Sequence, residues 1–193
     1  MNLGCGLNAS FEAVADADAA RLLWIDLDLA EVIAIRRNFY SASPHRSIIE
    51  GDVTDPRLFA RLAWEPGRPA IVVAEGLLYY LGPAQVETFF RSQAEAADVR
   101  GAHLEMVFDY AGPLGAWMVG RRPAHRQLGT SYAWALRLAS DLQRLDPRLE
   151  VVEDSDVFLG AMNSAARRLN SIYRLIAGGS IGGCLHLRRP API

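Results

Sequence analysis

The first 110 residues alternate between short apolar runs and longer stretches in which apolar residues recur at helical spacing. The apolar runs predict strands at residues 21–28, 47–53, 69–76 and 102–110. The stretches between them predict helices at 11–20, 29–40, 56 onward and 82–97. The run at 69–76 is continuously apolar, as strands buried in a parallel sheet are. Strands alternating with helices of this length predict an α/β domain with a parallel sheet and right-handed crossovers.

The alternation stops at residue 111 and resumes further on. Residues 111–131 carry large apolar and basic side chains without a clear period, which predicts an irregular segment covering a substrate. A helix, a strand, a second helix and a closing strand are expected at 134–145, 149–158, 163–177 and 183–189. We expect one domain over residues 1–193, because this length suits a single core.

Composition narrows the class of protein. The chain is 51% hydrophobic and 22% charged, and its net charge of −2 gives no electrostatic support for nucleic-acid binding. Cys5 and Cys184 form neither a disulfide framework nor a metal pattern, so no metal is expected. No apolar run is long enough to predict a membrane span. The expected setting is cytoplasmic, with a small molecule as partner, and self-association is left open.

A glycine-bearing turn lies at residues 2–8. Gly4 and Gly6 flank Cys5, and residues without a Cβ let the backbone approach a ligand closely. The turn leads into a predicted helix, whose first N–H groups can bind a ligand. The pattern fits both the dinucleotide fingerprint and the glycine motif of methyl-donor enzymes, so it predicts a cofactor turn without selecting the cofactor. A turn that binds no ligand is the alternative.

Two acids end the next predicted strand. Asp26 and Asp28 follow the glycines at a spacing of roughly 20 residues, where a carboxylate can accept ribose hydroxyls. Alternate residues of a strand point the same way, so both can face a pocket. We expect one of them to bind ribose and the other to cap the helix that starts near residue 29.

Two further acids separate the candidate cofactors. Asp52 follows the third strand, where a carboxylate can accept a hydrogen bond from an adenine amino group and Val53 can cover the ring. A nicotinamide enzyme needs no acid there. Glu75 ends a buried strand, where a carboxylate is costly unless it meets a cation or donors, and an ammonium or sulfonium ligand would supply that partner. The alternatives are helix capping by Asp52 or Asp55 and a structural Arg beside Glu75.

Substrate contacts are expected beyond residue 75. Tyr79 and Tyr80 can line a pocket, although core packing explains either equally well. Arg121 and Arg122 can bind an acidic substrate, and His125 in the same segment is a further candidate, with a solvated basic loop as the alternative. The four histidines form no catalytic pairing, so no catalytic residue is assigned.

The motifs at 2–8, 24–28, 51–53 and 74–81 together resemble the leucine carboxyl methyltransferase family. They are most similar to its bacterial branch of tetracenomycin-type polyketide O-methyltransferases. The resemblance implies a class I methyltransferase fold, with a mostly parallel seven-stranded sheet and helices on both faces. It also implies S-adenosylmethionine as the methyl donor and an oxygen acceptor, often a carboxylate.

Residue roles follow from the same resemblance. It places Gly4 and Gly6 beneath the methionyl part of the donor and Asp28 at the ribose. It places Asp52 and Val53 at the adenine, and Glu75 near the methionine portion. The family usually has Asp in place of Asn8, and a Pro after the strand-two acid, where this chain has Leu29 and Ala30. Relatives also carry an upstream helical segment, whereas only residues 1–3 precede the glycines here, so a truncated first strand is expected.

The expected function is therefore an S-adenosylmethionine-dependent O-methyltransferase. Its acceptor would be a carboxylate or hydroxyl of a small, polyketide-like molecule, and an ionised carboxylate needs no general base. One alternative is a truncated methyltransferase fold that binds a partner without catalysis. A nicotinamide-dependent oxidoreductase is the other.

Overall fold

A computed structural model describes residues 1–18, 22–123, 130–155 and 164–192. The strands form one seven-stranded sheet in the order β3-β2-β1-β4-β5-β7-β6, and β7 runs antiparallel to both of its neighbours. The strands are β1 (Asn2–Leu3), β2 (Trp24–Asp28), β3 (Arg46–Glu50), β4 (Ala70–Ala74), β5 (Leu104–Ala111), β6 (Glu150–Ser155) and β7 (Gly182–Arg189). The predicted mostly parallel α/β sheet is confirmed. The strand order reverses between β1 and β4, and ligands of open α/β sheets bind at such a point.

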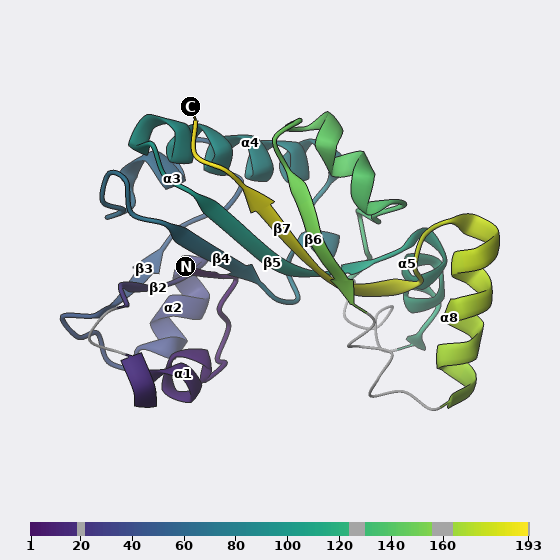
Figure 1. The fold of residues 1–193 in the computed structure, drawn as a ribbon. Helices are drawn as coiled ribbons and strands as arrows, with labels where there is room; N and C mark the ends of the chain where they lie inside the picture. The colour runs from purple at the N-terminus through teal and green to yellow at the C-terminus, as the bar shows by residue number, and fades with distance from the viewer. Residues whose placement is uncertain (19–21, 124–129, 156–163, 193) are drawn as a thin grey trace.

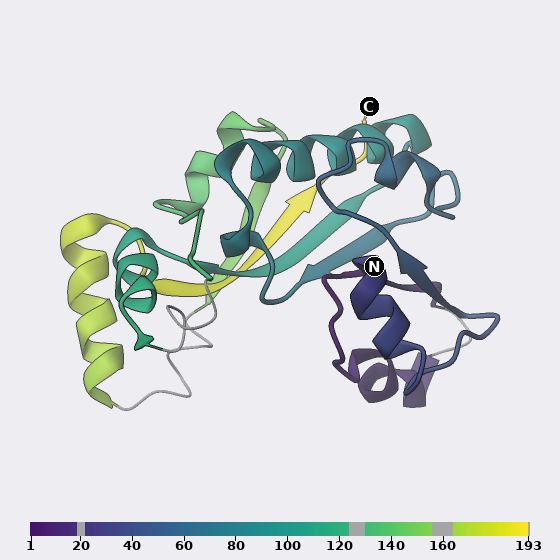
Figure 2. The same ribbon diagram turned by 180° about the vertical axis from the view of Figure 1, so that it is seen from behind.

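Helices lie on both sides of this sheet (Figures 1 and 2). They are α1 (Ser10–Asp18), α2 (Ala30–Arg36), α3 (Leu58–Arg61), α4 (Pro83–Arg100), α5 (Pro113–Gly120) and α8 (Ser164–Ala177), with 3-10 turns η2 (Leu78–Tyr80) and η3 (Ala139–Arg144). In Figure 1, α3 and α4 run along one side, whereas α1 and α2 lie on the other side beside β2 and β3. α5 and α8 stand together near the start of β7.

The core lies between the sheet and α4. Val86, Phe89 and Phe90 of α4 are each 1% exposed, as the helical spacing predicts. Phe90 packs edge-on against Phe108 of β5 with ring centroids 5.6 Å apart, and Phe89 packs in the same way against Phe59 at 6.3 Å. These edge-to-face pairs fix α4 against β5 of the sheet and against α3.

The inner face of α2 differs from the prediction. The sequence suggests an apolar face that includes Leu29 and Ile35, but each of these residues is 51% exposed. The residues that α2 buries are Ile33 and Arg36. A buried arginine needs acceptors around it, and this one finds them in the glycine turn and in Asp26.

Two predicted segments beyond β5 are wrong in detail. The segment 111–131 contains the helix α5, which Pro113 begins at a position where no N–H is needed. The helix expected at 134–145 is reduced to η3, because backbone groups there take partners from elsewhere in the chain. Trp134 donates its N–H to Tyr79 O and Leu136 donates to Ala111 O. These bonds hold the segment extended across the carboxyl end of β5.

The amino edge of the sheet is open between β2 and β4. β1 pairs with both neighbours through two residues, whereas β2 and β4 have five residues each. An apolar cavity of about 390 Å³ lies there, lined by residues that include Met1, Leu23, Trp24 and Ile71. Ile71 is 58% exposed on this side. Within the described ranges, no helix is both long and apolar enough to cross a bilayer.

Candidate functional site

The glycine turn connects β1 to α1 at the carboxyl edge of the sheet. Gly4 and Gly6 have φ angles of 63° and 49°, in the left-handed region that other residues rarely adopt. A Cβ on Gly4 would lie 3.2 Å from Leu77 Cδ1, whereas a Cβ on Gly6 would meet no atom within 4 Å. The turn therefore packs against the segment after β4 on one side and faces open space at Gly6.

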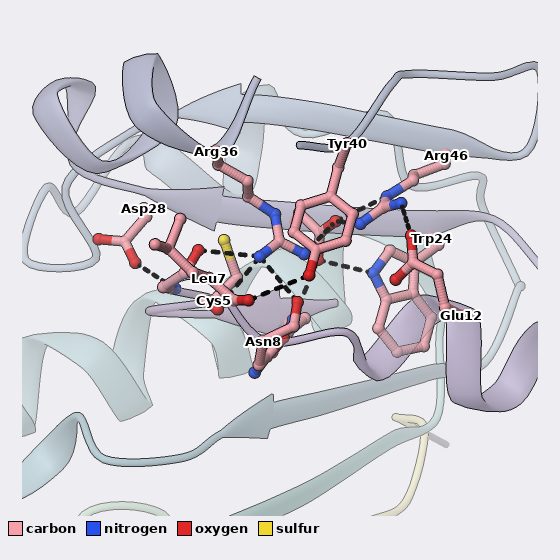
Figure 3. Close-up of polar contacts among 12 residues, drawn as sticks. Cys5, Leu7, Asn8, Glu12, Trp24, Asp28, Arg36, Tyr40 and Arg46 are labelled. Carbon is pink, nitrogen blue, oxygen red and sulfur yellow. Dashed lines mark hydrogen bonds and ion pairs between the residues drawn. The ribbon is translucent and has the colours of Figure 1, made fainter. Parts of the chain in front are cut away.

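Arg36 holds the inner side of this turn (Figure 3). Its Nη1 donates to the carbonyl oxygens of Cys5, Gly6 and Asn8 at 3.4, 2.8 and 3.0 Å. Tyr40 stacks on its guanidinium, with Cζ 4.5 Å from the ring centroid, and donates its hydroxyl to Leu7 O at 3.1 Å. Four successive carbonyl groups are thereby fixed by two side chains from α2 and the residues that follow it.

Cys5 lies at the centre of the turn but points inward. The side chain is 1% exposed, and burial raises the pKa of its thiol to about 11. Its backbone N–H donates to Leu27 O at 3.2 Å. Cys5 is predicted as a cofactor contact because it lies within the glycine turn; this prediction is corrected, because its thiol is buried and its backbone N–H is bonded to Leu27.

Asp26 is also committed to the fold, which corrects its predicted cofactor role. It is fully buried and pairs with the guanidinium groups of Arg36 at 3.0 Å and Arg46 at 2.7 Å. Trp24 Nε1 and Asn2 Nδ2 donate to it at 2.8 and 3.0 Å. Burial opposes ionisation of Asp26, but hydrogen bonds from these neighbours outweigh it and lower the pKa of the carboxyl.

Arg46 extends this buried network to α1. It donates from Nη1 to Glu12 at 2.5 Å and from Nε to Asp26 at 2.8 Å. Its guanidinium also lies over the rings of Phe11 and Tyr40, with Cζ 4.7 and 5.0 Å from their centroids. The ion pairs therefore connect β2, β3, α1 and α2 behind the glycine turn.

Asp28 is the acid that faces the turn. Its Oδ2 accepts from Gly6 N at 2.8 Å, and its Oδ1 accepts from Leu29 N at 2.8 Å. A carboxylate has about four acceptor positions, so two remain for hydroxyl groups of a ligand. Of the two acids of β2, Asp26 is buried among the arginines, so only Asp28 has a position from which it can accept from a ligand.

Asp52 and Val53 lie beyond β3 at the same edge. Asp52 is exposed, and its Oδ1 accepts from the N–H and the hydroxyl of Thr54 at 2.8 and 2.7 Å, which leaves Oδ2 for a ligand. Val53 is 6% exposed. Asp55 accepts from Arg57 N at 2.9 Å in the turn before α3, whereas the N-cap position of α3 is Arg57 and has no side-chain bond.

Glu75 follows β4 and is exposed, so the predicted burial of this carboxylate is wrong. The strand ends at Ala74, and the chain turns through Gly76, whose φ is 69°. An exposed carboxylate pays no cost of burial, so Glu75 does not need a cationic ligand as a partner. Glu75 nevertheless stands at the carboxyl edge between the glycine turn and β5.

A cluster of tyrosines lies next to this turn. Tyr79 stacks on Tyr132 with centroids 4.2 Å apart, and Tyr80 packs edge-on against both rings. The Tyr79 hydroxyl donates to Asp109 Oδ2 at 3.0 Å. Burial and the adjacent Asp109 raise the pKa of the Tyr79 hydroxyl, so it stays protonated as a donor.

Asp109 is a buried acid at the carboxyl end of β5. It is 6% exposed, and its Oδ1 accepts from Gly76 N at 2.7 Å. Burial raises the pKa of the Asp109 carboxyl, and the bonds from Gly76 and Tyr79 only partly oppose it. The acid thereby connects the turn after β4 to the tyrosine cluster.

A cavity of about 240 Å³ opens beside Asp109. Its lining includes Tyr79 and Tyr132 together with Met118 of α5 and Gly182 of β7. Arg122 also lines it and is exposed.

Some of the predicted substrate residues line this cavity and others do not. Tyr79 and Arg122 line it, while Tyr80 contacts it only through its tyrosine neighbours. Arg121 instead stacks on Trp117, with Cζ 4.0 Å from the ring centroid. His125 lies outside the described residues. Among the residues that are described, no group of three or more His, Cys, Asp or Glu side chains is placed to hold a metal ion.

Three residues of this edge are missing from the sequence-based set: Arg36, Asp109 and Tyr132. Arg36 looks like a surface residue of an amphipathic helix, and nothing local marks it as buried. Asp109 does have a signal, since it interrupts an apolar strand end in the way that Glu75 does. Tyr132 lies in a segment without a readable pattern.

The strand order, the antiparallel β7 and the glycine turn after β1 define a class I methyltransferase fold. A solved structure of a putative methyltransferase from Thermobifida fusca YX matches 98% of this chain and 72% of its own, with a TM-score of 0.61 and 18% identity.

Sequence comparison gives the same class, although no protein-family model matches the chain. The chain is 28% identical over 163 residues to the S-adenosyl-L-methionine-dependent methyltransferase dpfgK of Gibberella zeae, covering 79% of this chain and 53% of that relative. It is 28% identical over 153 residues to the tetracenomycin polyketide synthesis O-methyltransferase TcmP of Streptomyces glaucescens, covering 79% and 54%. The chain thus spans about half the length of the curated relatives it matches. The predicted resemblance to the tetracenomycin-type branch is confirmed.

Proposed function

We propose that the chain binds S-adenosylmethionine across the carboxyl ends of β1 to β4 and acts as an O-methyltransferase on a small molecule. The observation that carries the proposal is the open face of the glycine turn, with Asp28 bonded to Gly6 N at the switch point of the sheet. The names of the two relatives, one of which serves polyketide synthesis, support the acceptor class.

The residues at this edge fit the parts of the donor. Gly4 and Gly6 would pass beneath its methionyl part, since no side chain stands above Gly6. Asp28 would accept the ribose hydroxyls through its remaining acceptor positions. Asp52 would accept from the adenine amino group while Val53 covers the ring, and Glu75 would lie near the methionine amino group. When bound, the donor supplies an electrophilic methyl group on a sulfonium.

The protein's contribution to such a reaction is alignment. Methyl transfer is an in-line displacement, so much of the acceleration comes from holding the acceptor oxygen against the methyl carbon. Arg36 and Tyr40 fix the turn before any ligand arrives, which lowers the cost of ordering the site on binding.

The Gly6→Ala substitution tests where the donor lies. The added methyl group meets no protein atom within 4 Å, so the only folding cost is the left-handed backbone, about 1–2 kcal/mol. The same methyl group would occupy the donor's position. We expect the Kd for S-adenosylhomocysteine, measured by calorimetry, to rise at least about tenfold, equivalent to about 1.4 kcal/mol.

Gly101→Ala is the matched control. Gly101 has a φ of 59°, and a Cβ there also meets nothing within 4 Å, but the residue follows α4, away from the turn. It should lose similar stability and bind as the parent does. Equal affinities of the two variants would contradict the assigned donor position.

A further inference from the structure

Among the described residues that line the cavity beside β5, one charged side chain is buried, and it is an acid. Asp109 lines it and is 6% exposed, while Arg122, the other charged residue of the lining, is exposed. The two bonds that Asp109 accepts, from Gly76 N and from Tyr79, leave acceptor positions on the same carboxylate. The part of the cavity next to Asp109 can therefore accept a hydrogen bond and disfavours a second anion.

The rest of the lining suits a flat, apolar ligand. The stacked rings of Tyr79 and Tyr132 form part of it, and Met118 adds a pliable apolar contact. Gly182 and Gly183 contribute no side chains. A cavity of about 240 Å³ has room for a small fused aromatic ring system.

We infer that this cavity is the acceptor site, that it takes a flat aromatic ligand bearing a hydroxyl group, and that Asp109 is the base that receives the hydroxyl proton. The inference rests on the proposed methyl transfer and departs from the carboxylate acceptor that the family resemblance suggests. A carboxylate in the same place would lie against the Asp109 carboxylate, whereas a hydroxyl donates to it.

The position of Asp109 is suitable for this step. Its bond to Gly76 places it beside the turn that carries Glu75, where the methionine part of the donor is proposed to lie. As the hydroxyl oxygen bonds to the methyl carbon, the bond from that carbon to sulfur breaks and its electron pair stays on sulfur. The hydroxyl proton passes to Asp109 and then to solvent, so the neutral ether and the thioether are the products.

The first experiment needs no donor. Calorimetry of the full chain with 1-naphthol and 1-naphthoate compares two ligands of like shape that differ in the hydroxyl and the carboxylate. We expect 1-naphthol to bind at least about tenfold more tightly. Asp109→Asn removes the negative charge and should bring the two affinities together by improving 1-naphthoate binding. The half-exposed Glu87→Gln on α4 should leave their ratio unchanged.

The inference is overturned if 1-naphthoate binds as tightly as 1-naphthol, if neither binds, or if the ratio of the two affinities is unchanged in Asp109→Asn. Because the comparison of ligands on the parent chain needs no variant, a misfolded variant does not remove the test. Failure of the proposed donor site would appear separately, as a lack of S-adenosylhomocysteine binding.

The second experiment measures turnover with S-adenosylmethionine and 1-naphthol. Asp109→Asn should lower kcat about 100-fold without changing donor affinity, because general bases contribute about 10²–10⁴-fold. The rate of the parent should fall at low pH as Asp109 is protonated, which gives an acidic limb in the pH–rate profile. The Asp109→Asn variant should lose this acidic limb. Tyr79→Phe removes a bond that lowers the Asp109 pKa, so the limb should move to higher pH. An unchanged profile in both variants overturns the assignment.

Other ionisable groups around Asp109 do not give the same limb. Those nearest are Tyr79 from η2, Tyr132 from the segment before η3, Cys184 from the paired position on β7, Arg122 after α5 and Glu75 after β4. Burial raises the pKa of each of Tyr79, Tyr132 and Cys184, so these three stay neutral in the acidic range. Three further acids lie around these groups: Glu75 after β4, and Glu153 and Asp154 on β6. Whatever each does to the rate, Glu75→Gln, Glu153→Gln and Asp154→Asn should each keep the fall in rate at low pH.

Discussion

The Asp26→Asn substitution is expected to lower the free energy of unfolding by about 3–5 kcal/mol at pH 7. Asp26 is fully buried between the guanidinium groups of Arg36 and Arg46. An amide of the same shape leaves two buried cations without their shared counter-charge, which is the costly way to break a buried ion pair. Urea denaturation followed by circular dichroism measures the loss. The exposed Glu31→Gln on α2 is the control and should change stability by less than about 0.5 kcal/mol.

The pH dependence of the stability difference between the parent and Asp26→Asn gives a second check on Asp26. Its pKa is lowered by folding from the unfolded value of about 3.9, so its contribution is fully present above that pH. The contribution is lost as pH falls through the lower folded pKa, where the carboxylate of the parent is protonated. The stability difference between the parent and Asp26→Asn should therefore shrink below about pH 4. A difference that stays constant from pH 7 to pH 3 would contradict the assigned charge.

Arg36→Met is expected to cost a similar amount, about 3–5 kcal/mol, and to weaken the donor site as well. The guanidinium pairs with Asp26 and also donates to the carbonyl groups of Cys5, Gly6 and Asn8. Arg37→Met, at an exposed neighbouring position, is the matched control.

Arg36→Lys separates the two roles of this residue. Lysine keeps the charge beside Asp26, but an ammonium lacks the planar fork that reaches the carboxylate and three carbonyl groups at once. We expect stability between those of the parent and Arg36→Met, with a Kd for S-adenosylhomocysteine about 10-fold to 100-fold higher than that of the parent. Unchanged affinity in Arg36→Lys would show that the turn does not depend on this side chain.

The sheet and its carboxyl edge could be predicted because local pattern determines them. The runs that end near Asp28, Asp52 and Glu75 are apolar and short, and the stretches between them have helical spacing. The carboxyl ends of parallel strands share one edge, so these acids were expected to gather there. Their order also carries the resemblance that the relatives confirm.

The roles of Asp26 and Arg36 could not be predicted, because both depend on contacts across the fold. Asp26 and Asp28 look alike in sequence, and the choice between them is made by Arg46, 20 residues further on. The sequence predicts a helix at 134–145 and not a 3-10 turn for the same reason, because the backbone N–H of Trp134 donates to the carbonyl oxygen of Tyr79. Local spacing does not report such partners.

Titration of the full chain with S-adenosylhomocysteine, followed by calorimetry, tests the proposed donor site most directly. NADH serves as the comparison, because the glycine turn alone fits either cofactor. We expect one molecule of S-adenosylhomocysteine to bind per chain and NADH to give no saturable heat. A folded chain that binds NADH in its place, or that binds neither, would contradict the donor site.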